Sequence, residues 1–205
     1  MKVITRMLGP IDTNCYVLIN EGHALVIDPG GPFDDLDAIL KSENAVLDAI
    51  ALTHAHFDHI MGLSDVMEDV KVPVYVEEAD LPMMTDGESN LSSTYVRGGY
   101  RFEEAVPVSD GQQLEIAGFQ FRVIHTPGHT PGGCCYYMEQ EGVLFSGDTL
   151  FQTSVGRSDF PGGSASALVR SVKEKLLVLP EETHVYPGHM EETTIGYEKL
   201  HNPFI

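Results

Sequence analysis

The feature that most constrains the fold is the heptapeptide THAHFDH, which follows the apolar run AIAL. It places three histidines and one aspartate, His54, His56, Asp58 and His59, within six positions. His54 and His56 alternate along the chain, so both imidazoles can reach one metal ion. Asp58 and His59 lie further along the chain, where a helix is expected to start. Their side chains are therefore expected to point away from those of His54 and His56. This loop is therefore predicted to serve two neighbouring metal ions.

Further ligand-type residues follow other apolar runs. His129 lies between two Pro-Gly turns in TPGHTPG, Asp148 ends the run LFSGD, and His189 ends VYPGH. The Asp148 carboxylate could bridge two ions. Five histidines and two aspartates, with no cysteine, suit zinc and favour a catalytic over a structural site.

The remaining histidines, His23, His125, His184 and His201, are interpreted as surface or core residues. Among these four, only His125 is a candidate to support the ligands. The cysteines, Cys15, Cys134 and Cys135, include an adjacent pair that suits neither an ordinary disulfide nor a C-x-x-C metal site. We expect all three to be reduced thiols.

Short β-branched runs broken by turn residues predict many strands. The predicted strands cover residues 2–8, 14–20, 23–31, 47–54, 72–78, 112–118, 119–125, 133–139, 142–148 and 183–189. Apolar spacing predicts helices at 33–44, 59–70, 164–180 and 191–200, the third capped by Ser164. Residues 84–104 interrupt the pattern with Ser, Gly and Asn, as either a lid over a site or a mobile surface loop.

This order of elements predicts an α/β protein. Apolar strands need cover on both faces, which two sheets packed together with helices outside would provide. We therefore expect a four-layer αββα sandwich of two mixed β-sheets, formed by residues 1–205 as one domain. No low-complexity linker divides the chain.

Charge and hydropathy narrow the class of partner. The formal net charge is −19, from 31 acidic and 12 basic residues, and a nucleic-acid backbone requires a basic surface. No apolar run approaches the ~20 residues of a membrane span, and the first residues lack the apolar core of a secretory signal. We expect a cytoplasmic protein acting on a small molecule, as a monomer or small homo-oligomer, with no nucleic-acid or membrane partner.

The motif H-x-H-x-D-H resembles the hallmark of the metallo-β-lactamase fold superfamily of hydrolases, and the similarity runs over nearly the whole chain. The stretches GDTLF and GRSDFPGG and the ending HNPFI resemble small, single-domain relatives of glyoxalase II (hydroxyacylglutathione hydrolase). The resemblance implies that a first metal is held by His54, His56 and His129. A second metal would be held by Asp58, His59 and His189, with Asp148 bridging the two ions.

The resemblance further implies two Zn²⁺ per chain, with iron or manganese as other possible metals. The implied reaction is hydrolysis of a thioester of the hydroxyacylglutathione type by a metal-bridged hydroxide, which Asp58 would help to orient. No dedicated general acid is evident. Because a thiol of pKa ~8.5 leaves as a thiolate, thioester or lactone cleavage fits better than amide cleavage.

Two alternatives remain open. Persulfide dioxygenases share the same motifs and the GR-x-D-F stretch, and hold one Fe(II) with residues that map to His54, His129 and Asp148. A non-catalytic metal-binding domain is the other alternative. It would take up metal but turn over no ester or thioester.

Arg157 is the candidate substrate-binding residue. The family places a basic residue nine positions after the bridging aspartate, and Arg157 matches it. It could anchor a substrate carboxylate bidentately, or pair with Asp159 at the surface. Asp159 and Glu191 stand where glutathione-binding tyrosines would be expected, and the chain ends at Ile205, before the helical domain of larger glyoxalase II enzymes. Glutathione thioesters are therefore expected to be modest substrates.

Overall fold

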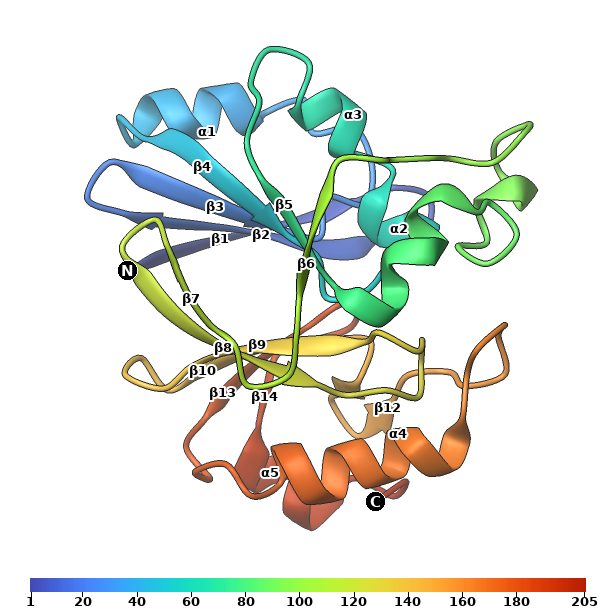
Figure 1. The fold of residues 1–205 in the computed structure, drawn as a ribbon. Coiled ribbons are helices and arrows are strands. Elements are labelled where there is room, and N and C mark those ends of the chain that lie inside the picture. Colours follow the sequence, from blue (N-terminus) through green and yellow to red (C-terminus); the bar gives the residue numbers. More distant parts are fainter.

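The computed structural model describes residues 1–205 as two six-stranded sheets packed face to face (Figure 1). The first sheet has the order β1-β2-β3-β4-β5-β6. Its strands are β1 (Lys2–Leu8), β2 (Thr13–Asn20), β3 (His23–Ile27), β4 (Val46–Ala51), β5 (Val74–Glu77) and β6 (Ala105–Val108). The strands β1 to β3 are antiparallel, and β3 to β6 are parallel, so this sheet is mixed.

The second sheet has the order β14-β13-β10-β9-β8-β7. Its strands are β7 (Gln113–Ile116), β8 (Phe119–His125), β9 (Cys134–Met138), β10 (Val143–Gly147), β13 (His184–Pro187) and β14 (Thr193–Thr194). Only β10 and β13 pair in parallel. A small hairpin of β11 (Leu150–Phe151) and β12 (Ser154–Val155) lies apart from both sheets. Each six-stranded sheet is thus built from one continuous half of the chain.

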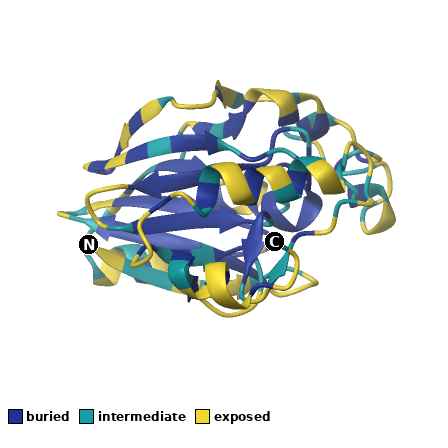
Figure 2. Cartoon of the chain, turned by 90° about the horizontal axis from the view of Figure 1, so that it is seen from below, coloured by how far each residue is buried: buried dark blue, intermediate teal, exposed yellow.

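The side chains that alternate along each strand fill separate apolar layers. On β2, Tyr16 and Leu18 face the second sheet, where they pack with residues such as Phe121 and Phe145. Their neighbours on β2 face the opposite side and pack against helices. Figure 2 shows the result, with mostly buried strands and helices whose outer faces are exposed. Where both faces of a sheet are covered, as at β2, β9 and β10, the strands read as nearly continuous apolar runs, whereas the edge strands β1 and β7 keep exposed polar residues.

Helices cover the outer face of each sheet. The first sheet is covered by α1 (Leu36–Ser42), α2 (Phe57–Ile60) and α3 (Leu63–Val66). The second is covered by α4 (Ala165–Ser171), the π-helical turn η3 (Val172–Leu176) and α5 (Ile195–His201). The predicted four-layer αββα sandwich of two mixed sheets is confirmed. None of the helices combines the length and the apolar composition needed to cross a membrane.

The predicted helix at 59–70 is wrong in its extent. The structure has two short helices there, α2 and α3, and α2 already begins at Phe57. The break falls at Gly62, whose N–H donates to the Pro29 carbonyl at 2.8 Å. A Cβ at Gly62 would overlap the Gly31 carbonyl oxygen, so the chain bends where it packs against this neighbouring turn.

The other boundaries differ modestly. Helix α4 begins after Ser164, whose hydroxyl accepts from the Ala167 N–H as predicted, but the helical run ends at Leu176 in a π-helical turn. Strand β6 was not predicted, because Pro107 interrupts its apolar run. Proline is tolerated there because β6 is an edge strand.

Residues 84–104, expected to be either a lid or a mobile surface loop, form a series of turns anchored by a few buried side chains. They begin within the last two residues of the 3₁₀ helix η1 (Glu78–Thr85) and contain η2 (Ser92–Thr94). The buried Asn90 fixes the segment, because its amide donates to the carbonyls of Met83 and Tyr100. Its own carbonyl accepts from the Phe57 N–H at 2.8 Å, which ties the segment to α2.

Candidate metal centre

All seven predicted ligands lie at one end of the two sheets. The first sheet supplies His54 and His56 after β4, and then Asp58 and His59 on α2. The second sheet supplies His129 after β8, Asp148 after β10 and His189 after β13. Their ligand atoms form three overlapping groups, each within 4.8 Å: His54, His56 and His129; His54, His59 and Asp148; Asp58, His59 and His189.

The first and third groups have the membership expected for two separate ions. In the first, His56 Nδ1 lies 2.8 Å from His129 Nε2. In the third, Asp58 Oδ2 lies 3.2 Å from His189 Nε2 and 3.3 Å from His59 Nε2. Both groups draw on both sheets.

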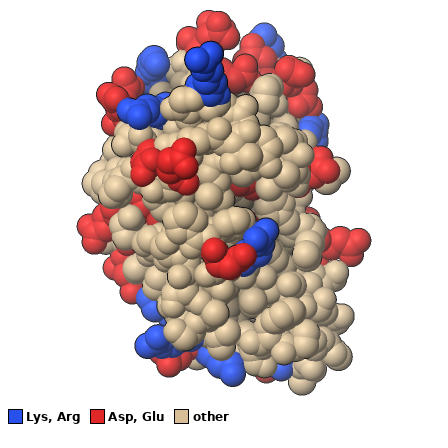
Figure 3. All heavy atoms as spheres, turned by 90° about the vertical axis from the view of Figure 1, so that its right-hand side faces the viewer, with Lys and Arg blue, Asp and Glu red and all other residues tan.

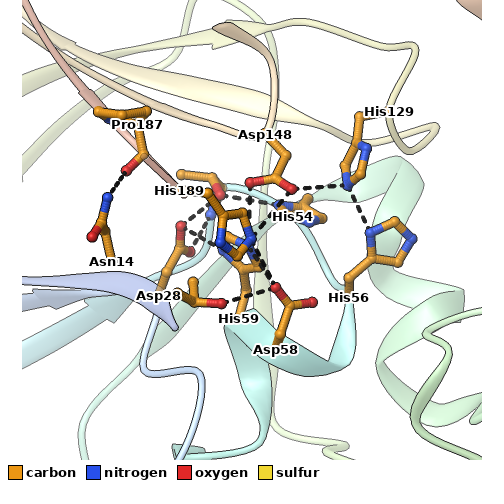
Figure 4. Close-up of polar contacts among 12 residues, drawn as sticks. Asn14, Asp28, His54, His56, Asp58, His59, His129, Asp148, Pro187 and His189 are labelled. Carbon is orange, nitrogen blue, oxygen red and sulfur yellow. Dashed lines mark hydrogen bonds and ion pairs between the residues drawn. The ribbon is translucent and has the colours of Figure 1, made fainter. Parts of the chain in front are cut away.

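Asp148 lies between these two groups (Figure 4). Its Oδ1 is 3.4 Å from His59 Nε2, and its Oδ2 is 3.5 Å from His129 Nε2. The same Oδ2 is 3.7 Å from His189 Nε2. One carboxylate therefore faces ligand atoms of both groups, which is the geometry that a bridging ligand requires.

The site fits divalent metal ions because its polar atoms are buried without partners. His54 Nε2, His59 Nε2 and Asp148 Oδ1 are shielded from solvent, yet none makes a hydrogen bond. Buried polar atoms of proteins nearly always have a hydrogen-bond partner, so several unpaired atoms in one cluster need an explanation. Metal coordination provides one. The donor set of imidazoles and carboxylates suits zinc, iron and manganese.

The electrostatics of the cluster favour bound cations. Burial and the neighbouring His59, His129 and His56 lower the pKa of His54 well below its usual value. Burial and His129 lower the pKa of His56 to about 3. Both imidazoles are therefore neutral at pH 7, as coordination requires.

The third group, Asp58, His59 and His189, carries the negative charge. Burial would raise the pKa of Asp58, but His59 and His189 hold it well below its usual value. Burial would lower the pKa of His59, but Asp58, Asp28 and Asp148 raise it well above its usual value. Three carboxylates around one imidazole create a negative potential that would attract a divalent cation.

Asp28 orients His59 and was missed in the sequence. Its Oδ2 lies 2.9 Å from His59 Nδ1, at an angle too oblique for a good hydrogen bond, and its oxygens also accept from the Thr53 N–H and hydroxyl. An acidic partner on the outer nitrogen directs the other nitrogen, Nε2, to the metal. The available signal in the sequence was an aspartate directly after the apolar run of β3, in IDPGG.

We expect Asp28→Asn to weaken the metal site around His59 by about 10- to 100-fold, because the acidic partner of its Nδ1 is lost. The measurement is metal content during titration with a chelator. Asp48→Asn is the matched control, since Asp48 Oδ2 also lies 2.9 Å from a histidine Nδ1, that of the surface residue His23. Equal metal retention by both variants would show that Asp28 does not support the site.

Asp80 holds together the two loops that supply the first group. This buried residue of η1 accepts from the Ala55 N–H at 3.0 Å, the Thr130 hydroxyl at 2.8 Å and the Gly132 N–H at 2.6 Å. The loop before α2 and the loop around His129 are thereby fixed to one carboxylate. No motif in the sequence marked Asp80, because its three partners are distant along the chain.

Two further features fix the ligands from behind. The His129 Nδ1–H donates to the Arg157 carbonyl at 2.6 Å, which directs Nε2 to the cluster. Gly188 lies directly behind the centre, where a Cβ would overlap Asp148 Oδ1 and come 2.8 Å from His59 Cε1. The close approach of this backbone to the ligands requires glycine.

The four remaining histidines lie outside the cluster. The structure pairs His23 with Asp48 and His184 with Glu192, and packs His201 on Tyr197. His125 Nε2 lies 2.8 Å from the Pro131 carbonyl, so it braces the loop that carries His129. The cysteines are all buried and free.

A cavity of about 520 Å³ opens onto the cluster. Its floor includes His56, Asp58, His129, Asp148 and His189. Its walls include Ile11, Phe57, Leu91, Tyr95, Phe151, Ser154, Val155, Arg157, Phe160 and Met190. Figure 3 faces this side of the molecule, where uncharged residues make up most of the central surface. The wall is thus mainly apolar, and residues 84–104 contribute to it.

Arg157, the candidate substrate-binding residue, lines this cavity but is already paired. Its Nε and one terminal nitrogen donate to the two Asp159 oxygens at 2.9 and 2.8 Å. Its guanidinium also lies over the Phe160 ring, 4.2 Å from the centroid. Both charged side chains are about two-thirds exposed, so the pair is readily opened.

The fold and the His/Asp cluster define a class of protein, the metal-dependent hydrolases with an αββα sandwich. The chain belongs to the metallo-beta-lactamase superfamily, whose sequence model matches residues 8–189. It is 39% identical to the probable metallo-hydrolase YqgX of Bacillus subtilis, over 100% of this chain and 98% of that protein. It is 32% identical to the hydroxyacylglutathione hydrolase GloC of Haemophilus influenzae, over 94% of this chain and 92% of GloC.

Solved structures agree with this assignment. The BLEG-1 B3 metallo-beta-lactamase has a TM-score of 0.92 and 44% identity, covering 99% of both chains. TTHA1623, described in a di-iron-bound form, has a TM-score of 0.86 and 38% identity, covering 100% of both chains. ETHE1 from Myxococcus xanthus has a TM-score of 0.79 and 29% identity, covering 99% of this chain and 84% of that one.

Proposed function

We propose that this protein is a binuclear, zinc-dependent hydrolase that cleaves thioesters of the hydroxyacylglutathione type. The position of Asp148 between two ligand groups carries the proposal, because it is the arrangement that two bridged ions need. The similarity to GloC supports the thioester as the substrate class. We propose a small-molecule partner and a monomer or small homo-oligomer.

Two divalent ions held by these groups would supply Lewis acidity and lower the pKa of a shared water toward ~7. Asp58 would orient that water. Its Oδ2 accepts from the Thr13 hydroxyl at 2.9 Å and faces His59 and His189, so Oδ1 remains to accept a hydrogen bond from the water. The low pKa of Asp58 keeps this carboxylate ionised at neutral pH.

The cavity favours a leaving group that needs no proton. Asp148 is held ionised, since His59 and His129 lower its pKa although burial would raise it. The cavity walls contain no lysine and no glutamate, and the one phenol, Tyr95, is half-exposed at the mouth. An amine would require a general acid to leave, whereas a thiolate, conjugate to a thiol of pKa ~8.5, does not. Thioester cleavage therefore matches the residues that the cavity offers.

The test is elemental analysis of protein purified without added metal, followed by a panel of thioesters, esters and amides. We expect two metal ions per chain, mainly zinc, and thioester turnover that a chelator abolishes and zinc restores. Full metal loading without turnover of any ester or thioester would instead indicate a non-catalytic metal-binding domain.

A dioxygenase with one Fe(II) is the second candidate. His54, His129 and Asp148 lie together, with the rings of His54 and His129 4.7 Å apart and His129 Nε2 3.5 Å from Asp148. The di-iron-bound form of TTHA1623 makes iron the metal against which zinc must be tested. One iron per chain with O₂-dependent turnover of a persulfide would establish this candidate.

We expect S-lactoylglutathione to turn over with a weak apparent affinity. Arg157 can anchor a glutathione carboxylate only after leaving Asp159, so Arg157→Ala should raise KM by a few-fold, and Asp159→Asn should lower it. Steady-state kinetics of both variants would measure this, with Arg170→Ala on α4 as the control. Unchanged KM in both variants would mean that Arg157 only forms a surface ion pair.

A further inference from the structure

Three large apolar side chains are exposed around the mouth of the cavity. Ile11 is 45% exposed, Tyr95 51% and Met190 60%, and all three line the cavity. They come from the β1–β2 turn, from residues 84–104 and from the segment after β13. Such side chains are individually unremarkable on a surface, but their convergence from three separate segments on one opening is characteristic of a binding site.

The apolar surface continues inward to the ligands. Tyr95 stacks on Phe57, with the ring centroids 4.2 Å apart. Phe160 lies edge-on to His56 at 5.6 Å, and Phe151 lies edge-on to His189 at 6.1 Å. Aromatic walls therefore flank both ligand groups and extend outward to the exposed rim.

Charged groups in this cavity do not favour an anionic tail. The floor contains Asp58 and Asp148, and the one basic side chain in the wall, Arg157, is neutralised by Asp159. A substrate carboxylate would have to compete with Asp159 for that guanidinium. An uncharged chain would meet no such competition and would cover apolar surface.

From this arrangement we infer that the natural substrate carries an uncharged, apolar acyl group, which Ile11, Tyr95 and Met190 cover at the mouth of the cavity. The inference rests on the proposed thioester hydrolysis, and it replaces the hydroxyacyl group of that proposal with an apolar acyl group. The three rim residues are specificity determinants. They contact the acyl chain of the substrate beyond the reacting carbonyl, whereas the ligand cluster carries out the reaction.

The experiment uses acyl thioesters of N-acetylcysteamine, an uncharged thiol, from acetyl to hexanoyl. A fully buried methylene contributes about fourfold in kcat/KM, so a partly open rim should give about tenfold to two-hundredfold over the series. In the variant Ile11→Ser/Tyr95→Ser/Met190→Ser this gain with chain length should fall to a few-fold. The control is Val178→Ser/Leu200→Ser, which removes exposed apolar side chains elsewhere.

Binding provides a second measurement that needs no turnover. The thioether analogue of the hexanoyl substrate, with a methylene in place of the carbonyl, should bind the zinc-loaded protein with a negative heat-capacity change. The rim variant should bind it more weakly than the control does. If acyl thioesters turn over but the rate is independent of chain length, the inference is wrong and the proposed function stands.

If no thioester turns over, the proposed hydrolysis is wrong. The thioether titration still tests whether the cavity binds an apolar chain. Absence of thioether binding, or equal binding by the rim variant and the control, would overturn the inference.

Discussion

Asp148→Asn is expected to abolish most hydrolysis and to weaken both metal sites together. The carboxylate lies between the two ligand groups, 3.4 Å from His59 Nε2 and 3.5 Å from His129 Nε2. An amide has one weakly basic oxygen and cannot bridge two cations. Because the Lewis acidity of bound ions contributes several kcal/mol to such reactions, we expect kcat/KM to fall by at least about a hundredfold.

Elemental analysis and steady-state kinetics on the same preparations would measure this. Asp37→Asn, on the exposed face of α1, removes one negative charge without touching the site and should retain both ions. His125→Ala should be much milder than Asp148→Asn, because His125 only braces the loop around His129. A variant at Asp148 that keeps two ions and full activity would show that this residue does not bridge.

The fold should survive Asp148→Asn. The three apolar layers comprise most of the buried residues, and a chain of this size needs no metal to form its core. Thermal unfolding of the variant and of the original protein, both with chelator, should therefore differ by only a few degrees.

Gly188→Ala is expected to disrupt the metal centre through steric overlap alone. A Cβ there would overlap Asp148 Oδ1 and crowd His59, and the Gly147 backbone lies 3.1 Å away. The backbone after β13 cannot retreat easily, because the Gly188 N–H donates to the Gly147 carbonyl and the Gly188 carbonyl accepts from the Asn14 N–H, both at 2.8 Å. We expect loss of at least one ion and about a hundredfold lower activity, since metal sites tolerate little displacement.

Gly142→Ala provides a demanding control for this substitution. Gly142 has a φ of +64°, so alanine is strained there, but a Cβ would meet nothing within 4 Å. It should lower the unfolding temperature and leave metal content unchanged. If Gly188→Ala binds two ions as tightly as this control, then the backbone at Gly188 moves more freely than its hydrogen bonds indicate.

The sequence alone predicted the sandwich and the seven clustered side chains, for a physical reason. Buried strands appear as apolar runs, and each candidate ligand follows such a run or starts the next helix. In the structure these run ends lie at one end of the two sheets. Local signals of this kind can be recognised in the sequence because they depend only on residues that are neighbours along the chain.

Features that depend on distant contacts could not be predicted. Asp28 meets His59, and Asp80 meets Thr130 and Gly132, across separations along the chain that no local pattern records. The break at Gly62 likewise depends on its contact with the turn at Pro29–Gly31. The apolar rim of the cavity also comes from segments with no shared motif.

Each sheet is assembled from one continuous half of the chain. This arrangement affects how long the protein persists in a cell. Ligands from both halves meet in each group, so bound ions would fasten the halves to one another. An ion that binds only the folded state stabilises it by about 2.7 kcal/mol at a concentration one hundred times its Kd. The exposed connection between β6 and β7 joins the halves and offers a site for proteolysis when they separate. The abundance of this protein should therefore follow the supply of its metal.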